Sequence, residues 1–170
     1  MENHGYRSAG PATATHPGGP LVLAVALLVV AALTLTPAGT GWTWGAPLAE
    51  LRWYATGLDS EATVLQLIGN LCLLAAPAGL VVALWPSAGR TGYLVALAVG
   101  AAAGIEVLQW LLPLGRVVSP LDAALNAGGA VAAGLLVRQV QRASAAVRPE
   151  AGRPAAASGP AEPVGAIRRG

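Results

Sequence analysis

Long runs of apolar residues constrain this chain more than any other feature, because an α-helix needs about 20 such residues to cross a bilayer. The chain is 55% hydrophobic and 11% charged, with a mean hydropathy of +0.60. These values are typical of membrane proteins. We therefore predict an all-α, polytopic integral membrane protein, a bundle of four transmembrane helices over residues 21–36, 62–85, 92–112 and 120–137.

The flanking segments divide the chain further. We expect residues 1–19 to form an N-terminal cytoplasmic tail, residues 20–138 one four-helix transmembrane domain, and residues 139–170 a disordered cytoplasmic tail rich in Arg, Ala and Pro. The first run also has the length of the apolar part of a secretory signal peptide. The long preceding segment and the lack of an Ala-x-Ala site after the run favour a retained helix, with a cleaved signal as the alternative.

Arginine is unevenly distributed outside the apolar runs. From residue 137 onward six arginines face two glutamates, whereas segment 37–61 holds one arginine and three acidic residues. Arginine-rich segments stay in the cytoplasm. We therefore predict a multi-pass protein of the cell membrane with both termini in the cytoplasm and segment 37–61 outside. Four aromatic residues predict that this segment forms an interfacial belt or a short interfacial helix: Trp42, Trp44, Trp53 and Tyr54.

Polar side chains stand inside three of the apolar runs, in pairs three or four residues apart that share one helix face. At a rise of 1.5 Å per residue, the pairs lie within roughly 12 Å of the outer helix ends. Such groups are costly in hydrocarbon and therefore face the interior of a bundle. We expect one polar cluster in the outer leaflet, built from Gln66 and Asn70, Glu106 and Gln109, and Asp122 and Asn126.

Arg116 lies in the short loop above this cluster. We expect its guanidinium group to bridge the carboxylates of Glu106 and Asp122, while Gln109 and Asn126 complete the hydrogen bonding. Two interpretations remain open. The cluster either fixes the register of the helices or forms a binding site at the outer membrane surface.

Two further features predict how the helices pack. Gly100 and Gly104 form a GxxxG pattern, which is expected to press one face of the third helix against a neighbour. Pro77 cannot donate a hydrogen bond to the carbonyl of Leu73, and we expect it to kink the second helix.

The sequence contains no metal-binding or nucleophile motif. His4 and His16 stand near the N-terminus without Cys or carboxylate ligands at suitable spacing, and the single cysteine, Cys72, has no partner for an internal disulfide. We predict no cofactor, no metal, no catalytic residue and no nucleic-acid partner.

Three motifs follow one another in order: E-x-x-Q, then G-R, then D-x-x-x-N at the start of a Gly-rich helix. This order resembles the hallmark of the VanZ-like family of integral membrane proteins, in which an earlier Asn followed by Pro and Gly also recurs. Members often carry further acidic residues where this chain has Ser119 and Leu121. The resemblance covers residues 65–137 and is carried by Asn70, Pro77, Gly79, Glu106, Gln109, Gly115, Arg116, Asp122, Asn126, Gly128 and Gly129.

The resemblance implies a cell-envelope membrane protein, since the founding member is linked to low-level resistance to the antibiotic teicoplanin. Our first hypothesis is a non-enzymatic protein whose polar cluster binds a lipid headgroup, a glycopeptide-type antibiotic or a partner helix. The alternatives are a membrane-embedded hydrolase or transferase for a lipid-linked envelope substrate, with Glu106 as general base and Arg116 as anion stabiliser, and a scaffold subunit. The expected partners are membrane lipid, an envelope lipid precursor or a glycopeptide, and a homo-oligomer is compatible with each hypothesis.

Overall fold

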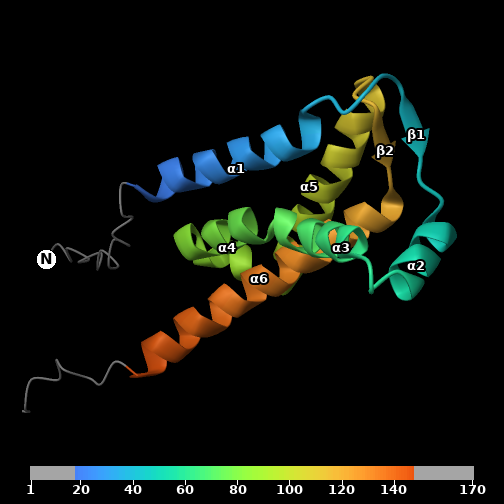
Figure 1. Cartoon of the computed structure of the whole chain (residues 1–170). Coiled ribbons are helices and arrows are strands. Elements are labelled where there is room, and N and C mark those ends of the chain that lie inside the picture. Colours follow the sequence, from blue (N-terminus) through green and yellow to red (C-terminus); the bar gives the residue numbers. More distant parts are fainter. Residues whose placement is uncertain (1–17, 148–170) are drawn as a thin grey trace, which may run out of the picture.

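A computed structural model of the chain describes residues 18–147. Helices account for most of these residues, in agreement with the predicted all-α class, and two three-residue strands are added (Figure 1). In chain order the elements are α1 (Gly19–Leu35), β1 (Trp42–Trp44), α2 (Pro47–Thr56), α3 (Glu61–Leu73), α4 (Ala75–Leu84), the 3-10 turn η1 (Pro86–Gly89), α5 (Thr91–Leu111), β2 (Arg116–Val118) and α6 (Pro120–Val147).

Three helical segments are long and apolar enough to cross a membrane: Glu61–Leu84, Thr91–Leu111 and Pro120–Val147. The first two agree with the predicted second and third runs to within one residue. The remaining apolar helix, α1, has 17 residues and is shorter than these three. Large apolar side chains such as Leu21, Leu28 and Leu65 point away from the bundle and are exposed, which is the surface expected of a protein that lies in lipid.

The second long segment consists of two helices, α3 and α4, which are interrupted at Leu74. Pro77 lies in the first turn of α4 and has no N–H group to donate to the carbonyl of Leu73, so α3 cannot continue through this point. The backbone resumes helical hydrogen bonding at Ala78, whose N–H donates to the carbonyl of Leu74. The predicted kink is therefore confirmed as a break between two helices.

Helix α6 forms the centre of the bundle and packs against α3, α4 and α5, while α1 packs against α4 and α5 (Figure 1). Small residues allow these helices to approach closely. The central cluster of buried residues consists of four alanines and two larger side chains: Val30, Leu74, Ala98, Ala102, Ala127 and Ala130.

Helices α3 and α6 approach closely at Gly129, where a Cβ atom would overlap the carbonyl oxygen of Leu71 on α3. Gly100 and Gly104 instead face open space, since a Cβ atom at either position would have no neighbour within 4 Å. The prediction that the GxxxG pattern presses against a neighbouring helix is therefore wrong. The spacing of two glycines identifies a face without bulk, but it does not determine whether another helix lies on that face.

Strands β1 and β2 form a parallel pair, in which Trp42 is opposite Arg116 and Trp44 is opposite Val118. The preceding residue, Gly115, has a φ of +65° and lies against the backbone of Gly39, a position that excludes a side chain. This pair was not predicted from the sequence, because strands of three residues carry no detectable alternation. The pair and α2 lie together at one end of the helices (Figure 1).

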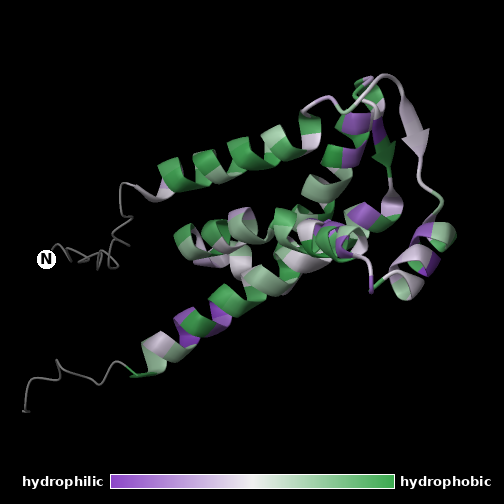
Figure 2. Ribbon diagram, viewed as in Figure 1, coloured by the Kyte–Doolittle hydropathy of each residue, from purple (hydrophilic) through white to green (hydrophobic). Residues whose placement is uncertain are grey.

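Helix α6 continues beyond the predicted end of the last span to Val147. The prediction of a disordered tail is therefore wrong for residues 139–147, while residues 148–170 lie outside the described part of the chain. Residues 138–147 contain no Pro or Gly, and Arg, Gln and Ala favour helices, so nothing in the sequence ends the helix there. Figure 2 shows hydrophilic residues on this last part of α6 and around β2 and α2. The helical segments that lie between these two regions are mostly hydrophobic.

Candidate functional site

A cavity of about 580 Å³ lies between α1, α3, α5 and α6, beside the end of the bundle that carries the strand pair. All of the residues that the sequence analysis assigned to one polar cluster line this cavity. They are Gln66, Asn70, Glu106, Gln109, Arg116, Asp122 and Asn126. The structure thus brings together side chains from three helices and from β2.

Asp122 is held in the first turn of α6. Its backbone N–H donates to the hydroxyl of Ser119 at 3.1 Å, an N-cap interaction that fixes where the helix begins. Its Oδ1 atom accepts a hydrogen bond of 3.2 Å from the phenol of Tyr54, which in turn accepts one of 3.4 Å from the side-chain amide of Asn70. A chain of polar groups therefore joins α2, α3 and α6.

Tyr54 lies in α2, outside the membrane-spanning segments, and it is buried. Removal from water, together with the nearby negative charge of Asp122, raises the pKa of its phenol to about 12. The phenol therefore keeps its proton at neutral pH and acts as a donor to Asp122. From the sequence, Tyr54 was predicted only as part of an interfacial aromatic segment. Its hydrogen bond to Asp122 was not predictable, since no local spacing connects Tyr54 to α6.

Glu106 connects α5 to the turn that precedes α6. One of its oxygens accepts a hydrogen bond of 2.7 Å from the backbone N–H of Ser119. The hydroxyl of the same serine donates to Glu50 of α2 at 2.5 Å. Glu50 is thus a third carboxylate near the site, supplied by α2, which the sequence analysis did not identify.

From the sequence, Arg116 was predicted to bridge Glu106 and Asp122. The structure shows that it does not. Its guanidinium group donates to the backbone carbonyls of Leu33 at 2.9 Å and Thr36 at 3.0 Å. These carbonyls lie at the C-terminal end of α1, where the last turn of a helix leaves acceptors without intrahelical partners. The arginine therefore holds α1 against the rest of the bundle, and the two carboxylates take their hydrogen bonds from Ser119 and Tyr54.

Gln109 has a similar role on α5. Its side-chain amide is buried and donates a hydrogen bond of 3.0 Å to the carbonyl of Thr34, also in the last turn of α1. Gln109 and Arg116 together satisfy several free carbonyls at this helix end. Both residues line the cavity, but their hydrogen bonds serve the attachment of α1.

Asn126 differs from the other cavity residues. It is only 2% exposed, and within residues 18–147 its Oδ1 atom has no hydrogen-bond partner. A buried acceptor without a donor costs about 1–3 kcal/mol. The only comparable atom in that part of the chain is the hydroxyl of Thr63, which is fully buried and does not line the cavity.

A second, apolar groove of about 350 Å³ lies on the other side of Glu106. Its walls come from β1, α5, β2 and the start of α6, and Glu106 borders both this groove and the polar cavity. The other lining residues are Trp44, Ala103, Val107, Trp110, Val118, Pro120 and Ala123. A polar space and an apolar space therefore meet at one carboxylate.

Within residues 18–147, no three His, Cys, Asp or Glu side chains are grouped closely enough to hold a metal ion. Cys72 is a free, exposed thiol on α3. The two histidines, His4 and His16, lie outside the described residues.

Comparison with known proteins assigns the family. The sequence model of the family described as VanZ/LLP1 matches residues 23–141, a range that includes every residue of the cavity. No curated protein and no solved structure matches the chain. Since this match covers more than half of the sequence, the chain is a membrane protein that belongs to the VanZ/LLP1 family.

Proposed function

We propose that this protein is a multi-pass, non-enzymatic protein of the cell envelope, whose polar cavity binds the hydrophilic part of an amphipathic molecule. In this proposal α1 is a fourth transmembrane helix, of about 26 Å at 1.5 Å per residue. Arg90 directly precedes α5, and Arg138 and Arg142 lie in the C-terminal half of α6. These are the ends of the two helices remote from the cavity beside β2, so the positive-inside rule supports cytoplasmic termini and a cavity on the external side.

The observation that carries the proposal is the unpartnered Oδ1 atom of Asn126 in the cavity wall. An N–H or O–H group of a ligand would supply the hydrogen bond that this buried acceptor lacks. Glu106, Asp122, Gln66 and Asn70 also line the cavity, so its wall contains further carboxylate and amide groups that can accept hydrogen bonds. This composition favours a ligand group that carries hydroxyl or amine donors, such as a sugar or an amino sugar.

The size of the two spaces supports an amphipathic ligand. A volume of about 580 Å³ is in the range of small-molecule sites, which is roughly 300–1,000 Å³, and accommodates a headgroup rather than a whole glycopeptide. The apolar groove beside Glu106 offers Trp44 and Trp110 for an acyl or prenyl chain. Lipid-linked envelope precursors and lipoglycopeptide antibiotics both combine a donor-rich polar part with such a chain.

No observation favours the enzymatic alternative. Ser119 is the hydroxyl nearest to two carboxylates, but it is 1% exposed and its hydrogen bonds hold Glu50 and Asp122. A nucleophile must reach its substrate, and this serine does not line the cavity. Glu106 is likewise engaged by a backbone N–H group.

The test measures binding and stability on the same variants. The full chain in lipid nanodiscs is titrated with teicoplanin and with a lipid-linked cell-wall precursor, and Asn126→Leu is compared with Thr63→Val. Each variant removes one of the two unpartnered buried polar atoms, but only Asn126 lines the cavity. We expect Asn126→Leu to weaken binding about tenfold, as one hydrogen bond to a buried acceptor implies, and Thr63→Val to leave it unchanged.

Thermal stability separates this function from a scaffold. If Asn126 serves ligand binding, Asn126→Leu should not lower the Tm, because the substitution removes a buried acceptor that has no hydrogen-bond partner. Unchanged binding of both probes in Asn126→Leu, together with a lower Tm, would instead identify a purely structural cluster.

A further inference from the structure

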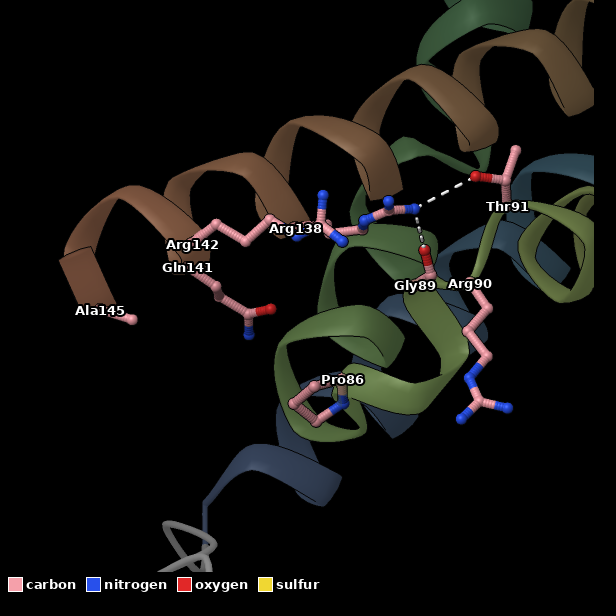
Figure 3. A pocket seen from close by; sticks show the side chains of 8 residues that line it. All are labelled: Pro86, Gly89, Arg90, Thr91, Arg138, Gln141, Arg142 and Ala145. Carbon is pink, nitrogen blue, oxygen red and sulfur yellow. Dashed lines mark hydrogen bonds between the residues drawn. The ribbon is translucent and has the colours of Figure 1, made fainter.

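A further open pocket, of about 880 Å³, lies where α5 begins and α6 approaches its C-terminal end, remote from β2, which follows α5 and precedes α6. Figure 3 shows the residues that line it. Its walls come from η1, the first residues of α5 and the C-terminal half of α6. Three of the described residues that line it are arginines, Arg90, Arg138 and Arg142, and none of them is acidic. The cavity therefore carries positive charge that its own walls do not neutralise.

Arg138 is oriented by its neighbours. Its Nη1 atom donates to the carbonyl of Gly89 at 2.8 Å and to the hydroxyl of Thr91 at 3.1 Å (Figure 3). Both hydrogen bonds use the same nitrogen atom. Within residues 18–147 the Nε and Nη2 donors have no such partner, and this pair of donors has the geometry that binds two oxygens of one phosphate.

The other two arginines are free to contribute. Arg142 lies one helical turn after Arg138, so both side chains start from the same face of α6, and Arg90 comes from the junction of η1 and α5. Arg90 and Arg142 are both exposed, and neither guanidinium group donates a hydrogen bond to another described residue. Positive side chains from two separate elements thus border one space.

The N-terminus of α5 adds to the positive potential. The helix has 21 residues, begins at Thr91 in the cavity wall, has no side-chain cap, and carries no acidic residue in its first turn. Its first N–H groups therefore remain available for an anion, and the helix dipole favours negative charge at this point.

Two aromatic residues indicate the depth of the cavity in the membrane. Trp85 and Tyr93 flank its lining residues in sequence and are 48% and 56% exposed. Exposed Trp and Tyr side chains at the ends of membrane helices lie at the level of the lipid headgroups. An anion that reaches the three arginines at this level is most simply presented by a phospholipid.

We propose that this cavity binds the phosphate group of an anionic membrane phospholipid. The site is separate from the polar cavity near β2 and does not depend on the function proposed for it. One phosphate would receive the paired donors of Arg138, with Arg90 and Arg142 providing additional charge from either side.

The experiment uses the purified full chain in detergent and measures bound lipid by native mass spectrometry. Phosphatidylglycerol is compared with diacylglycerol, which has the same chains and no phosphate. The double variant Arg90→Gln/Arg142→Gln removes two charges whose side chains make no internal hydrogen bonds. Arg52→Gln, an exposed arginine on α2, is the matched control.

We expect wild type to retain phosphatidylglycerol over diacylglycerol, and the double variant to bind phosphatidylglycerol about 30-fold more weakly with an unchanged Tm. Arg52→Gln should bind like wild type, and added salt should weaken binding. Equal retention of the two lipids, or an equal loss in Arg52→Gln, overturns the proposal. If inorganic phosphate binds as tightly as the phospholipid, and the double variant no longer binds it, the ligand is a free anion and the proposal of a phospholipid is wrong.

Discussion

The phenolic oxygen of Tyr54 lies 3.2 Å from Oδ1 of Asp122, so that α2 donates a hydrogen bond to the first turn of α6 across 68 positions of sequence. Asn70 of α3 donates to the same phenol at 3.4 Å. One hydroxyl group therefore joins three elements around the polar cavity. A variant that lacks this hydroxyl therefore tests the attachment of α2 without changing the residues through which the long helices pack.

Replacement of Tyr54 by Phe keeps the ring and removes this hydroxyl. We expect the free energy of unfolding to fall by about 1–2 kcal/mol, because Asp122 and Asn70 each lose a hydrogen-bond partner at a partly buried position. Thermal unfolding in nanodiscs measures the change. Tyr93→Phe is the matched control, since that side chain is exposed at the opposite end of the bundle. An equal shift in the two variants would contradict a specific role for Tyr54.

The same phenol predicts a loss of stability at high pH. Its pKa is raised from 10.0 to about 12 in the folded protein. Below pH 10 both the folded and the unfolded chain keep the proton, so its contribution is fully present. Between pH 10 and 12 only the unfolded chain releases it, which favours unfolding, and the contribution is lost as the pH rises through 12.

Ultraviolet absorbance of tyrosinate checks this prediction. The difference between wild type and Tyr54→Phe should titrate near pH 12, and the difference in stability between the two proteins should shrink from pH 10 upward. A difference titration near pH 10 would show that the phenol is not buried against Asp122.

Arg116 is expected to hold α1 rather than to neutralise the cavity. Arg116→Gln removes hydrogen bonds to the carbonyls of Leu33 and Thr36, and we expect a loss of about 1–3 kcal/mol. Hydrogen exchange followed by mass spectrometry should show faster exchange in the last turn of α1. Arg52→Gln should leave that turn protected. If Glu106→Gln exposed α1 as strongly as Arg116→Gln, an ion pair between the two residues would explain the data better.

Two glycine substitutions test the packing of the bundle. Gly129→Ala places a methyl group on the backbone of Leu71, so α3 and α6 must separate, at a cost of about 1–3 kcal/mol. Gly104→Ala meets no atom within 4 Å and should be neutral or stabilise the protein by up to about 1 kcal/mol through helix propensity. Chemical unfolding of both variants measures the change in the free energy of unfolding at each glycine. The reverse order of stabilities would restore the GxxxG face as the helix contact.

Features that depend on one helix at a time were predictable from the sequence. Hydropathy located Glu61–Leu84 and Thr91–Leu111 to within one residue, and the missing N–H of Pro77 located the break at Leu74. Helical spacing also placed the polar pairs on faces that meet at one cavity. These inferences need only the rise and periodicity of a helix, together with the cost of a polar group in lipid.

Features that depend on how separate segments meet were not predictable. The partner of Arg116 is set by the path of the loop after α1, and that path depends on the positive φ of Gly115 and on pairing between two very short strands. Glu50 and Tyr54 reach the site only because α2 folds against α6. No local pattern in the sequence records either relationship.

The parallel pairing of β1 with β2 also constrains the order in which the protein is built. Ribosomes synthesise β1 well before β2, and α5 must be complete before the two strands can meet. Before α6 is synthesised, the phenol of Tyr54 has no Asp122 to donate to, and the backbone of Leu71 has no Gly129 to pack against. A chain that stops before α6 therefore leaves the hydroxyl of Tyr54 and the face of α3 around Leu71 uncovered, and only the finished polypeptide buries them.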